Sequence, residues 1–321
     1  MPAGYHARIM TGRQKARRAG GAARGVTVAA AALWLLAAPL PARQQVFRAT
    51  TDVVTLPVTV TAKGDTLVPG LQKDQFEVLE DGRPQTLTYF ATGATPDVPL
   101  HLGLLLDTSG SMQRDLPQAT SAAIRFINTL DEARDVTFVD FATQVRVSRF
   151  SPGSYPHLFE RIRGNTADGY TALYDALAMY LAAAESQDGQ KVLLLYTDGG
   201  DSRSETTFSE LVEMLRLSQV MVYVIGYMEH QTGTERALQT MRMNDVAHQT
   251  GGAAFYPGRK EDLEKIYTRI LDELNARYTL GYVSTNTAKD GTFRKVQVRV
   301  RAPEVSGLKV RTRPGYFASI R

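Results

Sequence analysis

The sequence contains no cysteine among its 321 residues. Disulfide bonds, thiolate zinc sites, cysteine nucleophiles and lipid attachment to a cysteine are therefore excluded. The five histidines are scattered, and no two of them have the spacing of metal ligands, so a histidine zinc site is not expected. The chain also has no P-loop and no Gly-x-Ser-x-Gly elbow, and no Gly-x-Gly-x-x-Gly follows its first predicted α/β strand. These absences argue against nucleotide-dependent enzymes, serine hydrolases and dinucleotide-binding dehydrogenases.

Long apolar runs are confined to the N-terminal region. Residues 1–42 contain six Arg or Lys and no Asp or Glu, and they include the apolar stretch Val26–Ala38. This pattern predicts a secretory signal peptide with cleavage near Ala42. The apolar stretch is shorter than the ~20 residues that a helix needs to span a bilayer. Leu40 stands where a small residue is preferred, so an uncleaved anchor remains an alternative, and Arg17-Arg18 leaves the Sec and twin-arginine routes open. We therefore expect a secreted, periplasmic or cell-envelope protein with no stable membrane span after signal cleavage.

The formal net charge of +4 comes from this leader. The rest of the chain has 31 basic and 33 acidic residues, a balance of about −2. A stripe of cations, formed by Lys295, Arg299 and Arg301 on a predicted strand, has no interleaved aromatic residues of the kind that bind nucleic acids. We interpret the stripe as a solvated face that protects a sheet edge, and no nucleic-acid partner is expected.

Three regions follow the predicted leader. Residues 46–95 have a β pattern in which Val54, Leu56, Val58 and Val60 alternate with polar residues and Pro57, and Pro57 favours an edge position for this strand. Residues 97–276 alternate strands with helices, which predicts an α/β domain with a Rossmann-like doubly wound, mostly parallel sheet. Residues 277–321 return to a β pattern. Because each β segment is too small to hold a core alone, we expect them to pair into one β-sandwich-like module into which the α/β domain is inserted.

The α/β elements can be placed by their apolar periodicity. The expected strands are Leu100–Leu106, Val136–Phe141, Val192–Tyr196, Val220–Ile225 and Ala253–Tyr256. The expected helices are Leu116–Leu130, Ala172–Ala184, Phe208–Ser218, Glu235–Thr250 and Glu261–Ala276.

The most informative motif stands at the end of the first of these strands. The apolar run from Leu102 ends in Asp107-Thr-Ser109-Gly-Ser111, so one carboxylate and two hydroxyls occupy alternate positions. Open parallel sheets bind their ligands at the carboxyl ends of the strands. Oxygen ligands of this kind suit Mg²⁺, Mn²⁺ or Ca²⁺ better than a soft metal.

This motif resembles the DxSxS element of von Willebrand factor type A (VWA) domains. The segment from Gly169 to Ala176 is similar to the element that contributes Thr171, and Leu195–Gly199 is similar to the element that contributes Asp198. The resemblance implies a metal-ion-dependent adhesion site (MIDAS) formed by Asp107, Ser109, Ser111, Thr171 and Asp198. It also implies that the two serines and Thr171 bind the ion directly, while the aspartates act through water.

The flanks carry a further resemblance. The segments Phe76–Gly82, Tyr278–Tyr282 and Arg313–Tyr316 are similar to secreted bacterial proteins of the acidobacterial type that carry a "VWFA-related" domain. This resemblance extends over nearly the whole chain after the leader, and it implies an architecture more than a biological role.

The resemblance implies a non-enzymatic binding module in cell adhesion. A divalent ion held by neutral hydroxyls and few carboxylates is only partly neutralised, so we expect it to capture an acidic side chain of a protein partner. The large ring of Tyr170 is expected at the rim of the site, where it would contact that partner. Alternative functions are a metal-assisted hydrolase or phosphatase on the same layout, and a structural envelope protein whose ion only stabilises the fold.

Each residue also has a simpler interpretation when taken alone. Asp107, Ser109, Ser111 and Thr171 are common helix caps, and Asp198 is a common turn residue. The three elements occur in the expected order, and it is this combination that favours a metal site. We interpret the neighbouring Asp140, Asp175 and Asp201 as structural.

Overall fold

The computed structural model describes residues 53–93, 98–130, 133–229, 231–258 and 260–320. The predicted signal peptide at 1–42 lies outside these residues, so its prediction stays untested. Within the described residues, no helix has both the length and the apolar character needed to cross a bilayer.

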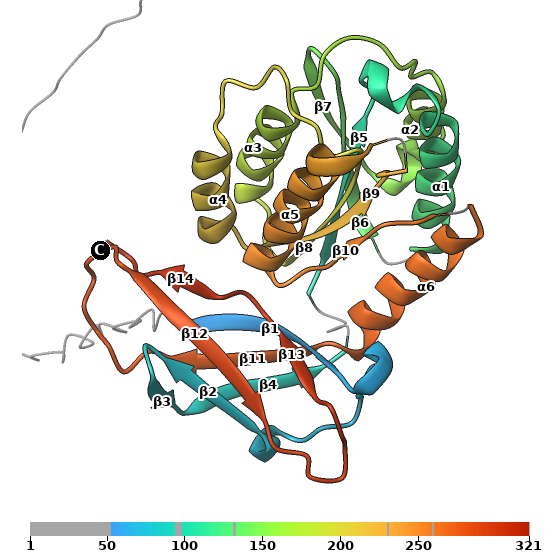
Figure 1. Ribbon diagram of the computed structural model, residues 1–321. Coiled ribbons are helices and arrows are strands. Elements are labelled where there is room, and N and C mark those ends of the chain that lie inside the picture. The colour runs from blue at the N-terminus through green and yellow to red at the C-terminus, as the bar shows by residue number, and fades with distance from the viewer. Residues whose placement is uncertain (1–52, 94–97, 131–132, 230, 259, 321) are drawn as a thin grey trace, which may run out of the picture. The chain divides into compact units, whose positions relative to one another are not determined.

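Six strands form the central sheet, in the order β10-β9-β8-β5-β6-β7 (Figure 1). All neighbours are parallel except β6 and β7, which run antiparallel at one edge. The strands are β5 (Leu100–Asp107), β6 (Ala133–Phe141), β7 (Val145–Phe150), β8 (Gln190–Thr197), β9 (Val220–Gly226) and β10 (Ala254–Phe255). The predicted mostly parallel sheet is confirmed. The edge strand β7 was not predicted from the sequence, because it has six residues and only Val145, Val147 and Phe150 among them are apolar.

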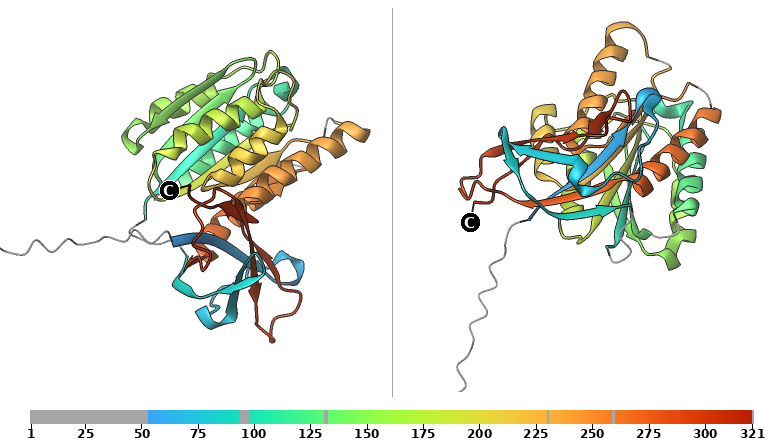
Figure 2. Two further views of the ribbon diagram at one scale, coloured as in Figure 1. Left: turned by 90° about the vertical axis from the view of Figure 1, so that its left-hand side faces the viewer. Right: turned by 90° about the horizontal axis from the view of Figure 1, so that it is seen from below.

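Helices cover both faces of this sheet (Figure 1; Figure 2). One face packs against α1 (Leu116–Thr129), α2 (Tyr155–Arg163) and α6 (Lys260–Ala276), and the other against α3 (Leu173–Glu185), α4 (Phe208–Leu217) and α5 (Gly233–Thr250). In β5, Leu104 and Leu106 point into the first core and Leu105 into the second. The strand is therefore buried on both sides, which explains its continuous apolar sequence. Helix α2 was not predicted from the sequence. It has nine residues and only two of them are buried, so its apolar pattern is short.

The remaining strands form two small antiparallel sheets, ordered β13-β1-β11-β4 and β14-β12-β2-β3. They are β1 (Val53–Thr61), β2 (Phe76–Glu80), β3 (Arg83–Gln85), β4 (Leu87–Thr92), β11 (Tyr278–Val283), β12 (Phe293–Val300), β13 (Lys309–Arg311) and β14 (Gly315–Phe317). Strands that precede the α/β region pair with strands that follow it, as β1 does with β11 and β2 with β12. Side chains from both sheets share one core, and we call these two sheets the β module.

Two expectations about sheet edges need correction. Pro57 pairs with Thr279 of β11, but β13 joins the other side of β1 only from Thr59 onward. β1 is thus an edge strand only along its first half, which is where the missing N–H of a proline does no harm. Lys295 and Arg299 of the cationic stripe lie on β12 and Arg301 directly follows it, and all three side chains are exposed as expected. However, β12 pairs with β14 only over Phe293–Lys295 and with β2 over Val296–Val300, so the stripe lies along a sheet edge only in part, beyond Lys295.

Polar contacts join the β module to the α/β region. Arg311 of β13 forms an ion pair with Glu273 of α6, whose side chain is 1% exposed. Arg313 donates to the backbone oxygen of Arg216 at 2.7 Å. Short 3-10 helices complete the fold at Lys63–Asp65, Lys73–Gln75, Gly110–Gln113 and Pro152–Ser154.

Candidate metal centre

Asp107 is the last residue of β5, and its side chain is completely buried. Its Oδ1 atom accepts hydrogen bonds from the Ser109 backbone N–H at 3.0 Å and from the Ser109 hydroxyl at 2.6 Å. Its Oδ2 atom accepts from the Thr197 hydroxyl at 2.7 Å. Both carboxylate oxygens are therefore held in place at the carboxyl end of the sheet.

Ser109 and Ser111 lie at the start of the 3-10 helix Gly110–Gln113. Their Oγ atoms are 3.1 Å apart. Ser109 is buried, whereas Ser111 is exposed. Ser109 occupies the N-cap position, but its side chain makes no capping bond and binds Asp107 instead. The two hydroxyls thus lie beside the carboxylate, with Ser111 on the solvent side.

Thr171 belongs to the loop before α3, and backbone hydrogen bonds hold this loop against the Asp107 segment. The Gly110 N–H donates to the Gly169 oxygen at 3.1 Å, and the Asp168 N–H donates to the Thr108 oxygen at 2.9 Å. Thr171 is 6% exposed. Ala172, not Thr171, occupies the N-cap position of α3, so the helix-cap interpretation of Thr171 does not apply.

Asp198 follows β8 directly and is mostly buried. Its Oδ1 accepts from the Gly200 N–H at 3.1 Å, which is the turn contact expected of a lone aspartate. Gly199 has φ +81°, and a Cβ atom there would come within 3.0–3.2 Å of Met228, Gln239 and Met243. Glycine is therefore required after Asp198 for this loop to close over α5.

The electrostatics of the site are those of two carboxylates buried together. Burial, the largest cause, and the negative charge of Asp198 together raise the pKa of Asp107 to about 7, against the lowering effect of the Ser109 and Thr197 hydrogen bonds. No cationic side chain contributes to this pKa shift. Two close carboxylates with hydroxyl oxygens beside them fit a hard divalent cation. In the described part of the chain no three His, Cys, Asp or Glu residues gather, so hydroxyls would have to complete any such ligand set.

The neighbouring aspartates are occupied by other partners. Asp140 binds both Arg146 and Arg161, with 2.6 Å between its Oδ1 and Arg161 Nη2. Asp175 accepts from two backbone N–H groups of the loop before α4, and Asp201 accepts from the Tyr174 N–H at 3.2 Å.

Tyr170 is 66% exposed beside Thr171. Its backbone N–H donates to Thr143 Oγ1 at 2.9 Å, so the loop is fixed while the ring remains in solvent. The structure therefore places this ring at the surface next to the candidate site.

Sequence analysis missed two residues that support the site. Thr197 binds Asp107, and Ser202 accepts a hydrogen bond of 3.0 Å from the Thr171 N–H. Thr197 could have been found, because it directly precedes Asp198 at the end of a buried strand. Nothing in the sequence near Ser202 indicates that its loop folds back onto Thr171.

Comparisons with known proteins agree with this geometry at the level of the fold. Residues 101–269 match the family model of the von Willebrand factor type A domain. Among curated proteins, none matches the chain.

Several solved structures are similar to the chain. A von Willebrand factor type A protein from Catenulispora acidiphila is 13% identical with a TM-score of 0.48, and the match covers 85% of this chain and 76% of that one. An aerotolerance-related membrane protein from Bacteroides fragilis is 14% identical with a TM-score of 0.44, over 54% and 98% of the two chains. The PilB minor pilin from Streptococcus sanguinis is 16% identical with a TM-score of 0.44, over 55% of this chain and 61% of the pilin.

Proposed function

The chain belongs to the von Willebrand factor type A domain family, and on that premise we propose that it is a non-enzymatic binding module with a divalent cation in its site. The proposed ligands are Asp107, Ser109, Ser111, Thr171 and Asp198, with Mg²⁺ as the expected ion and Mn²⁺ or Ca²⁺ as substitutes. We further propose a secreted or periplasmic location and membership of the "VWFA-related" type, both of which rest on the sequence resemblance.

The observation that supports this proposal most directly is the meeting of three distant segments at one sheet edge. Thr197 joins the Asp198 segment to Asp107 through a bond of 2.7 Å. Backbone bonds at Gly110 and Asp168 join the Thr171 loop to the same segment. These contacts join the three segments that carry the proposed ligands, which supports the proposal.

The same arrangement explains how a partner would be captured. The site contributes only two carboxylates, and its hydroxyl oxygens add no charge. These two carboxylates would at most balance the charge of a divalent ion without reversing it, so the ion would still accept a carboxylate oxygen of a partner protein at a free coordination position. Ser111 and Tyr170 are exposed, so this side of the site is open to such a partner.

Metal binding is the first test of the proposal. Titration with Mn²⁺ should show one site in the wild-type chain and at least tenfold weaker binding in Asp107→Asn. The matched control is Asp168→Asn, because Asp168 is an exposed neighbour whose amide oxygen would still accept from the Gly169 N–H. Equal Mn²⁺ affinity in wild type and Asp107→Asn would overturn the proposal.

Capture of an acidic group is the second test. The relaxation of Gly-Asp-Gly protons by the Mn²⁺-loaded protein should exceed that of Gly-Asn-Gly protons, and the difference should vanish with metal-free protein in EDTA. If Mn²⁺ binds and raises the melting temperature but the two peptides behave alike, the ion is only structural. Turnover of p-nitrophenyl phosphate that is abolished in Asp107→Ala would instead support a metal-assisted phosphatase.

A further inference from the structure

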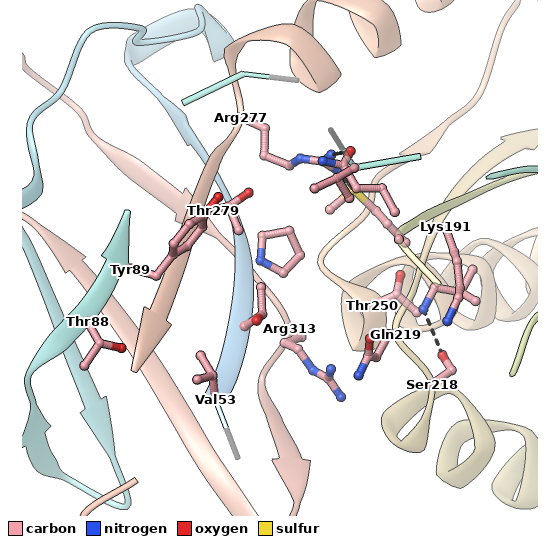
Figure 3. A pocket seen from close by; sticks show the side chains of 17 residues that line it. Val53, Thr88, Tyr89, Lys191, Ser218, Gln219, Thr250, Arg277, Thr279 and Arg313 are labelled. Atoms are coloured by element: carbon pink, nitrogen blue, oxygen red, sulfur yellow. Dashed lines mark hydrogen bonds between the residues drawn. The ribbon is translucent and has the colours of Figure 1, made fainter. Parts of the chain in front are cut away.

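A hollow of about 600 Å³ lies at the edge of the central sheet opposite the candidate metal centre (Figure 3). It is bounded by the first residues of β8 and β9 on one side and by β1, β4 and β11 of the β module on the other. Its volume is within the range of small-molecule sites, roughly 300–1,000 Å³. Of the proposed metal ligands, Asp198 follows the carboxyl end of β8, whereas the hollow meets the first residues of that strand, so the two sites are separate.

The lining of this hollow combines apolar walls with positive charge. Its charged side chains are Lys191, Arg277 and Arg313, and none of the described residues that line it is acidic. The apolar contribution comes from Val53, Pro57, Tyr89, Val98, Val220 and Met221. A cavity of this composition favours an anion that carries an apolar body.

Arg277 is the most unusual of these side chains, because it is 4% exposed and has no carboxylate partner in the described part of the chain. A guanidinium group has five N–H donors. One donates to the side-chain oxygen of Gln190, and a second reaches only the weak acceptor Met221 Sδ at 3.8 Å. Its Nε atom has no hydrogen-bond partner.

A buried cation with unused donors is unfavourable unless an anion accompanies it. Burial also lowers the pKa of Arg277, because the charged guanidinium loses its hydration there. Arg313 donates to two neutral backbone oxygens, those of Gly315 at 2.8 Å and Arg216 at 2.7 Å, and none of the ion pairs among the described residues involves it. Figure 3 shows Arg277 and Arg313 on different sides of the hollow.

We propose that this hollow binds a small amphipathic anion whose carboxylate or phosphate head contacts Arg277 and whose apolar body packs against the walls. The planar guanidinium suits both kinds of head group, because each offers two oxygens to parallel N–H donors. Tyr89, Val98 and Met221 provide the surface that an alkyl body would cover.

The test uses the full chain in EDTA, so that its outcome does not depend on the candidate metal centre. Decanoate, decyl phosphate and decanol are titrated by calorimetry below their aggregation concentrations. One or both anions should bind at least tenfold more tightly than decanol, and the stronger of the two identifies the head group. Equal affinity for decanol, or no binding of either anion, would overturn the proposal.

Variants locate the ligand. Arg277→Met should weaken anion binding at least tenfold, and Arg299→Met, at an exposed position on β12, should leave it unchanged. Because Arg277 is buried, its variant is checked for an intact circular dichroism spectrum. Val98→Trp changes a residue that is 36% exposed and should reduce binding by filling the hollow, with little effect on folding. Anion binding that persists unchanged in folded Arg277→Met or in Val98→Trp would place the ligand elsewhere and overturn the assignment.

Discussion

The hydroxyl of Thr197 donates to Asp107 Oδ2 at 2.7 Å, so the ends of β8 and β5 are joined side chain to side chain. The same Thr197 oxygen accepts from the Gly199 N–H at 2.9 Å. This second bond leaves the hydroxyl proton directed at the carboxylate. One residue therefore orients Asp107 and also fixes the loop that carries Asp198.

Thr197→Val should weaken Mn²⁺ binding by about tenfold, because residues that orient metal ligands typically contribute a factor of about 10–100 to affinity. The measurement is Mn²⁺ titration by calorimetry. Thr59→Val is the matched control, since the Thr59 hydroxyl is equally buried but has no hydrogen-bond partner. The control should bind Mn²⁺ like wild type; a similar loss in both variants would contradict an orienting role for Thr197.

The raised pKa of Asp107 predicts how the stability of the metal-free protein depends on pH. Its pKa is about 7 in the fold against 3.8 as the ordinary value, so the folded state retains a proton that the unfolded chain loses. This contribution to stability is complete below about pH 4 and is lost as the pH rises to about 7. One pKa unit corresponds to about 1.4 kcal/mol, which gives an upper limit of about 4 kcal/mol.

Urea denaturation in EDTA at pH 5 and pH 8 checks this expectation. Wild type should lose more free energy of unfolding between these pH values than Asp107→Asn, which has no proton to lose at this position. Adding Mg²⁺ at pH 8 should restore part of the loss in wild type only. Identical pH dependence of the two proteins would contradict the prediction.

The sequence predicts those parts of the fold in which the local pattern of apolar residues determines the secondary structure. Continuous apolar runs such as that of β5 mark strands buried on both faces, and the strand-helix alternation determines a parallel sheet. Short edge elements were missed, because β7 and β14 depend on pairing with strands that are already in place. The edge assignments of β1 and β12 hold only in part for a related reason, since the partners β13 and β14, which each cover one end of these strands, carry weak sequence signals of their own.

For the candidate site too, the sequence predicts some residues and misses others. Its proposed ligands lie in three motifs that can be read along the chain. The contacts that support them, such as Ser202 with Thr171, are separated by 31 residues and depend on loop conformation. Arg277 gives no local signal either, because its burial results from the β module packing over the strand starts.

Gly103→Ala should destabilise the α/β region by about 1–3 kcal/mol, the usual range for overpacking a core. A Cβ atom at this β5 position would lie 2.3 Å from the ring of Tyr180, which is itself 1% exposed and cannot move aside. Thermal or urea denaturation measures the effect. Gly153→Ala is the control, because nothing lies within 4 Å of its added Cβ, and it should remain within about 1 kcal/mol of wild type.

Glu80→Gln should destabilise the β module by about 1–3 kcal/mol, because it leaves buried hydroxyls without an acceptor. Glu80 is 2% exposed and accepts from the hydroxyls of Tyr282 and Tyr316 at 2.8 Å and of Ser284 at 2.5 Å. An amide offers one oxygen in place of two, so at least one donor loses its partner.

Hydrogen exchange would show whether the two ends of the chain form one cooperative unit. Glu80 lies on β2, whereas all three of its donors lie beyond the α/β region, on or next to β11 and β14. Glu80→Gln should therefore reduce amide protection in β2, β11 and β14 together. The control is Glu77→Gln on the same strand, whose partners Arg299 and Arg301 are exposed and 3.5–3.9 Å away, so it should change stability by less than about 1 kcal/mol. Loss of protection confined to β2 would mean that the N-terminal and C-terminal strands open independently, and the interpretation of residues 46–95 and 277–321 as one module would fail.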